Sequence, residues 1–105
     1  MASGTVKLMQ SKLAVFELKV TKTAVASGIT VFDADASRSG YKALGIAGYY
    51  VTGSGKCAAR SAYLKANNND GTSTSSDGYA VVEVFNSESS TSSITARIHV
   101  LYEKL

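Results

Sequence analysis

Three segments of this chain alternate apolar and polar residues with a period of two. They are residues 13–20, 79–85 and 94–102, and in the last of them Ile94, Ala96, Ile98, Val100 and Tyr102 share one face. Successive side chains of a strand point to opposite faces, so this period predicts strands that bury one face and expose the other. The alternation therefore favours a fold made of half-buried strands.

A glycine-bounded segment at residues 39–55 carries no charge after Lys42, and from 43 to 51 every residue is apolar, aromatic or glycine. A short run of this kind is typical of a strand buried on both faces, although periodicity alone leaves a helical segment open. Gly45 and Gly48 favour the strand, because glycine weakens a helix interior by about 1 kcal/mol. We therefore expect a central strand here.

Further strands are expected at residues 29–36 and 57–66, although the alanines of the second segment also suit a helix. Turn-forming residues separate the strands, at 37–40, 53–55, 67–78 and 86–93. Several short strands at this spacing predict an all-β fold, and we expect a small antiparallel β-sandwich that is jelly-roll-like. The 105 residues are expected to form one domain, with residues 1–10 as a linker or an initial strand.

The net charge of +3 is spread along the chain without a run of lysine or arginine, so no nucleic-acid partner is expected. One cysteine and one histidine predict neither an internal disulfide nor a metal site, and no cofactor is expected. The first residues lack the apolar core of a signal peptide, and no segment approaches the roughly 20 apolar residues of a membrane span. We therefore expect a protein made in the cytoplasm, without membrane insertion.

Two segments imitate ligand-binding loops. Residues 53–56, Gly-Ser-Gly-Lys, resemble the end of a phosphate-binding loop, but Tyr50 takes the place of its first glycine and Cys57 that of its hydroxyl residue. A plain turn is the better interpretation. Asp33 and Asp35 imitate the start of a calcium loop that lacks its required glycine and closing glutamate, so a solvated strand face is the better interpretation there.

No set of nucleophile, base and orienting residue can be identified, so we do not expect an enzyme and assign no catalytic residue. His99 lies between Arg97 and Leu101 on the more polar face of its segment and is expected to meet solvent or an interface. The thiol of Cys57, beside Lys56, is interpreted as a structural side chain, because a thiol enzyme also needs a base.

Tyrosine is the more informative residue type, with six copies in the chain. Tyrosine serves both cores and recognition surfaces, because it joins an apolar ring to a polar hydroxyl. The candidate surface-recognition residues are three tyrosines and two asparagines of the polar loop: Tyr49, Tyr50, Tyr63, Asn68 and Asn69.

Three segments, in this order, carry a resemblance to a known class of proteins. They read T-A-V-A-S-G-I-T-V-F-D at 23–33, S-G-Y-K-A-L-G-I-A-G-Y at 39–49 and S-I-T-A-R-I-H-V-L-Y-E-K at 93–104. The pattern resembles the small C-terminal domains of phage fibre and tail proteins, especially those of phages and prophages of Gram-positive gut bacteria. It covers most of the chain from about Val20 onward. Its marker residues look structural: Gly40, Tyr41, Leu44, Gly45 and Tyr102.

The resemblance implies a virion structural or adhesion module at the end of a fibre or tail protein, in a homotrimer that contacts the host surface. The apolar residues at 43–51 and Leu101 are compatible with such an interface. The alternative is a carbohydrate-binding, lectin-like module with tyrosines stacked on sugar rings. These two readings overlap where a fibre tip binds a host glycan.

Overall fold

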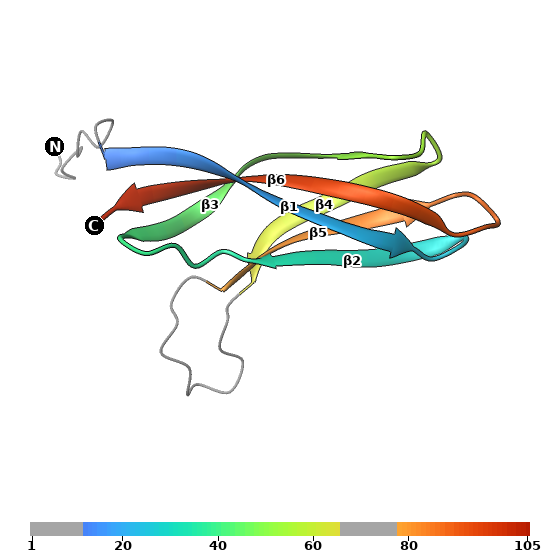
Figure 1. The fold of residues 1–105 in the computed structure, drawn as a ribbon, viewed down its shortest axis with the longest axis horizontal. Coiled ribbons are helices and arrows are strands. Elements are labelled where there is room, and N and C mark those ends of the chain that lie inside the picture. The colour runs from blue at the N-terminus through green and yellow to red at the C-terminus, as the bar shows by residue number, and fades with distance from the viewer. Residues whose placement is uncertain (1–11, 66–77) are drawn as a thin grey trace, which may run out of the picture.

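The computed structural model describes residues 12–65 and 78–105, which form six strands and no helix. The strands are β1 (Leu13–Ala24), β2 (Gly28–Asp35), β3 (Tyr41–Thr52), β4 (Cys57–Lys65), β5 (Tyr79–Asn86) and β6 (Ser92–Lys104). They build two antiparallel three-stranded sheets that pack together (Figure 1). The expected all-β sandwich is confirmed, and the segment at 57–65 is a strand rather than a helix. The sandwich shares with a jelly roll the packing of two antiparallel sheets, but a jelly roll has eight strands.

The strand order is β1-β6-β3 in one sheet, called sheet A, and β2-β5-β4 in the other, called sheet B. β6 and β5 are therefore the central strands, and the expectation of a central strand at 43–51 is wrong. β3 is an edge strand whose register shifts twice, between Ala43 and Gly45 and between Ile46 and Gly48. Glycine packs poorly in a strand interior and marks bulges, which are common at sheet edges.

The core lies between the two sheets and is formed by the alternating residues that the sequence predicts. Side chains with no exposed surface come from the inner faces of both sheets: Phe32, Ala80, Val82, Val84, Ile94, Ala96, Ile98, Val100 and Tyr102. β6 supplies five of them, one at every second position. β6, the last strand of the chain, therefore lines the sheet A side of the core, as its period-two alternation predicts.

One end of the sandwich is closed by an aromatic cluster. The buried Tyr102 hydroxyl donates a hydrogen bond to the carbonyl oxygen of Ala36 (2.7 Å), which ties β6 to the segment after β2. The rings of Phe16, Tyr41 and Tyr102 meet edge to face, and the Arg38 guanidinium lies 3.5 Å from the centre of the Phe16 ring. These contacts join both sheets at the end where β6 finishes.

The opposite end is held by the fully buried side chain of Asn86. Its amide nitrogen donates to the carbonyl oxygens of Val25 (3.1 Å) and Ser90 (3.0 Å), and its oxygen accepts from the backbone N–H of Glu88 (2.9 Å). A buried amide is tolerated only when its polar atoms are paired, as they are here. Asn86 therefore fixes the β1–β2 and β5–β6 turns together.

Residues 53–56 form a turn between β3 and β4, as expected. Gly53 has a φ of 126°, and a Cβ there would lie 2.5 Å from the carbonyl oxygen of Ser93. Only glycine allows this close approach of the turn to the start of β6. The expectation for residues 1–10 lies outside the described residues, as does the polar loop expected at 67–78 except for Gly78.

The face assignment of β6 makes a direct prediction. Ile98→Ala should destabilise the protein by about 2–5 kcal/mol, because Ile98 is fully buried and its truncation leaves a cavity. Thermal melts of Ile98→Ala and Arg97→Ala measure the difference, and Arg97→Ala should shift the melting temperature much less. Equal melting temperatures for Ile98→Ala and the parent would contradict the assignment.

Candidate functional site

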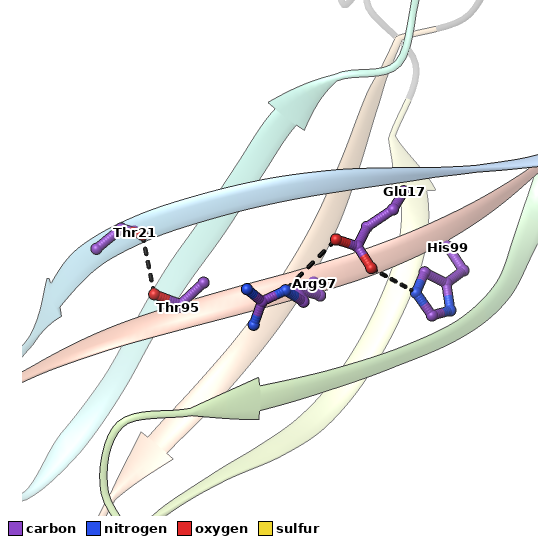
Figure 2. A network of polar contacts seen from close by, with 5 residues as sticks. All are labelled: Glu17, Thr21, Thr95, Arg97 and His99. Carbon is purple, nitrogen blue, oxygen red and sulfur yellow. Dashed lines mark hydrogen bonds and ion pairs between the residues drawn. The ribbon is translucent and has the colours of Figure 1, made fainter.

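The outer face of sheet A carries a cluster of polar side chains that the pairing of β1 with β6 creates. The two strands pair without a register shift from Leu13↔Glu103 to Ala24↔Ser92. Glu17 therefore lies directly opposite His99, and Lys19 opposite Arg97. Figure 2 shows the Glu17 carboxylate between the Arg97 and His99 side chains.

Glu17 binds both neighbours through separate oxygens. Its Oε1 lies 3.0 Å from Nε2 of His99, and its Oε2 lies 3.4 Å from Nε of Arg97. An ionised carboxylate only accepts hydrogen bonds, so Nε2 of His99 carries the proton and donates it. A hydrogen bond between the Thr21 and Thr95 hydroxyls (2.9 Å) continues the polar row along the same two strands (Figure 2).

These contacts shift the titration of Glu17. The hydrogen bond from His99 is the largest cause that holds the pKa of Glu17 below its ordinary value of 4.5, and the positive charge of Arg97 acts in the same direction. The partial desolvation of the carboxylate acts in the opposite direction and is outweighed. The carboxylate is therefore ionised at neutral pH and available as an acceptor.

β3 adds an aromatic side chain to the cluster. The Tyr50 ring lies edge to face with His99 at 6.0 Å, and the Arg97 guanidinium lies 6.0 Å from the ring centre. Gly48 stands opposite His99 in the register, and a Cβ there would lie 3.7 Å from Nδ1 of the imidazole. We call Glu17, Tyr50, Arg97 and His99 the Tyr50 platform.

The Tyr50 platform offers an exposed ring beside fixed hydrogen-bonding groups. Tyr50 is 46% exposed, and the side chains around it are partly exposed. Such a surface can stack a flat apolar face on the ring while the guanidinium donates to, and the carboxylate accepts from, polar groups at its edge. The arrangement suits a hydroxylated ligand such as a sugar.

The structure separates the tyrosines that the sequence singles out. Tyr49 pairs with the inward-facing Ile98, whereas Tyr50 pairs with the outward-facing Arg97, so the neighbours point to opposite faces of β3. Tyr63 lies on the outer face of sheet B, opposite Val81. All three rings are at least 40% exposed. Asn68 and Asn69 lie outside the described residues.

Glu17 and Arg97 are the residues of the platform that sequence reasoning did not single out. Their signal is weak: Glu17 lies on the polar face of the first alternating segment, and Arg97 lies with His99 on the polar face of the last. Bringing them together requires the β1–β6 register, which joins residues 82 positions apart. The alternation of a sequence predicts which residues share a face of a strand, but not which residues of two strands stand opposite each other.

The other residues considered from the sequence are Asp33, Asp35 and Cys57. Asp35 accepts a hydrogen bond from the backbone N–H of Ser37 (2.8 Å), and Asp33 lies on the outer face of β2. Cys57 is 8% exposed and lies in the core. Residues 12–65 and 78–105 contain no pocket and no group of three side chains that could hold a metal ion. None of their segments is a helix able to cross a membrane.

Comparisons with protein-family models, curated proteins and solved structures found no match to this chain.

The lowered pKa of Glu17 predicts how the platform responds to acid. His99→Ala should raise the pKa of Glu17 toward 4.5, because the hydrogen bond from His99 is the largest cause of the shift. Folding lowers this pKa, so the contacts of Glu17 stabilise the protein above pH 4.5 and are lost as pH falls through the folded-state pKa. An NMR titration of the Glu17 carboxyl carbon measures the shift.

The control is Lys19→Ala, which removes a charge two residues from Glu17 on the same face of β1. Lys19 is not a cause of the Glu17 shift, so this variant should leave the titration nearly unchanged. An unaltered Glu17 titration in His99→Ala would contradict the hydrogen-bonded arrangement.

Proposed function

We propose that this protein is a structural or adhesion module of a phage fibre or tail, with a role in contacting the host surface. The proposal combines the resemblance of three segments to such domains with one observation of the structure. Large apolar side chains are exposed on the outer faces of both sheets: Leu13, Val15 and Tyr50 on sheet A, and Ile29, Val31, Tyr63 and Phe85 on sheet B. Contiguous apolar surface is typical of assembly and recognition sites, and these side chains would contribute to such a surface in an assembly of several copies.

The arrangement of the turns supports the same role. β1 begins and β6 ends at one end of the sandwich, where Leu13 pairs with Glu103. The turns at 25–27, 53–56 and 87–91 gather at the opposite end (Figure 1). A module attached to a fibre through the first end would present those three turns and the adjoining sheet faces to a host cell.

The location can be tested on phage particles from the bacterium whose genome carries the coding gene. Gold-labelled antibodies against the purified domain should mark the fibre or tail tip in electron micrographs. Antibodies against a capsid protein of the same particles serve as the positional control. Particles that bind the capsid antibody but never the domain antibody would refute the proposal.

Threefold symmetry follows from the same proposal, because fibre shafts are threefold and their end domains usually share that symmetry. We expect light scattering of the purified chain at micromolar concentration to give three times the 11.0 kDa of one chain, or six times that mass where two trimers pair. Closed symmetry would then bury the same surface on every copy. A mass of one chain would rule the trimer out.

A carbohydrate-binding role is the second candidate, and the Tyr50 platform favours it. The exposed Tyr50 ring lies next to Arg97 and His99, and it could stack on a sugar while the guanidinium binds the sugar hydroxyls. A glycan array with the isolated domain should show selective binding that Tyr50→Ala abolishes. Tyr63→Ala, a similarly exposed tyrosine on the other sheet, should keep it. An array without any bound glycan would exclude this candidate.

A further inference from the structure

The four edge strands of the sandwich differ in how their outer edges are protected. β3 has two register shifts and β4 has one, and bulges turn an edge away from further pairing. The Lys22 side chain of β1 reaches across to β2, where its ammonium group donates to the carbonyl oxygen of Val31 (2.8 Å). β1 has no bulge: its 12 residues pair with β6 without interruption. Among the described edges, β1 is the long and regular one.

The outer side of β1 offers backbone groups for another strand. In an edge strand, every second residue points its N–H and C=O away from its neighbour. Within residues 12–65 and 78–105, no backbone hydrogen bond joins that side of β1 to another element. A strand added there would gain a ladder along most of the length of β1.

The charges of β1 select the strand that fits. Glu17 and Lys19 point to the outer face on either side of Leu18. An antiparallel second copy centred on Leu18 places each Glu17 opposite the Lys19 of the other copy, and opposite charges across a strand pair are favourable. Centring on Glu17 or on Lys19 would instead place like charges opposite each other. A shift of the register by one residue would place the inner face of the second copy on the outer side of the sheet.

The same register uses nearly the whole strand. Centred on Leu18, it pairs residues 13–23 of one copy with 23–13 of the other, out of a strand that spans Leu13–Ala24. On the inner face Phe16 would meet Val20 of the second copy, and both side chains are only partly buried at the margin of the core. On the outer face Val15, which is 53% exposed, would meet Thr21. The pairing thus covers apolar surface on both faces.

We propose that β1 is a self-association edge, on which a second copy of this chain pairs antiparallel about Leu18 and joins the two A sheets into one. The inference rests on the proposed self-assembly of the module and names a surface for it. The axis of this contact is twofold. It coexists with threefold symmetry only in an assembly of six chains, a closed arrangement with both kinds of axis.

Light scattering on the parent chain and on Lys19→Glu tests the pairing. The parent should have the mass of two or six chains. Lys19→Glu should halve this mass, because Glu17 of each copy then faces a second carboxylate at position 19 of the other copy. Lys56→Glu makes the same charge change in the β3–β4 turn and should leave the mass unaltered. A parent mass of one or three chains, or an equal effect of both variants, would overturn the proposal.

Mixing provides a rescue. Glu17→Lys alone should also halve the parent mass, whereas an equimolar mixture with Lys19→Glu restores opposite charges at every position and should recover the mass of the parent. A mixture that stays dissociated, with both variants folded by circular dichroism, counts against the register.

Amide hydrogen exchange gives a readout that needs no variant. In the parent chain, the β1 amides that point away from β6 should exchange more slowly as protein concentration rises, while the outward amides of the bulged edge β3 should not. Exchange that is independent of concentration in β1 would overturn the pairing. The outcomes separate the proposals. In light scattering of the parent, a mass of two chains would refute only the trimer, and a mass of three chains would refute only the β1 pairing. The fibre location is tested separately by the antibody labelling.

Discussion

The pairing of β6 between β1 and β3 is the interaction on which the rest of the structure depends. β6 is the only strand that joins the two edges of sheet A within the described residues, and its inner side chains from Ile94 to Tyr102 are fully buried. The same strand positions Arg97 and His99 on the outer face opposite Glu17. A single alternating strand therefore supplies the floor of the core and half of the Tyr50 platform. Burial of one face fixes the register, and the register then fixes the polar contacts of the other face.

The sequence predicts the elements well because each strand records its environment locally. Alternation at 13–20, 79–85 and 94–102 identifies strands that the structure extends by a few residues at their ends. It fails for β3, because a run of small and aromatic residues looks the same in a buried central strand and in a bulged edge strand. In the structure Leu44, Tyr49 and Tyr50 are exposed. The role of Asn86 was also not predictable from the sequence. It stands at the start of a serine-rich turn, and its three hydrogen bonds depend on turns that meet only in the folded protein.

Long-range register is the part of the candidate site that local patterns cannot supply. Glu17 and His99 are 82 positions apart in the sequence. Their hydrogen bond follows from the twelve consecutive residue pairs between β1 and β6 rather than from any sequence motif. The tyrosines show the converse. Composition singles out Tyr49, Tyr50 and Tyr63, but two adjacent residues of a strand face opposite ways, and Tyr63 belongs to the other sheet. Residue type suggests recognition, whereas topology decides which residues can act on one ligand.

The β1 edge and the Tyr50 platform are coupled by geometry. Glu17 lies on the strand that would pair with a second copy, and its outer face is the face that carries Tyr50, Arg97 and His99. Joining two A sheets edge to edge keeps both platforms on one continuous surface, with the two β3 strands five strand spacings, or about 24 Å, apart. A polymeric surface glycan could then engage both platforms at once, and the second contact would form at the high effective concentration set by the first. Weak binding by a shallow, exposed platform is sufficient for adhesion under those conditions, so self-association through β1 would be part of recognition as well as of assembly.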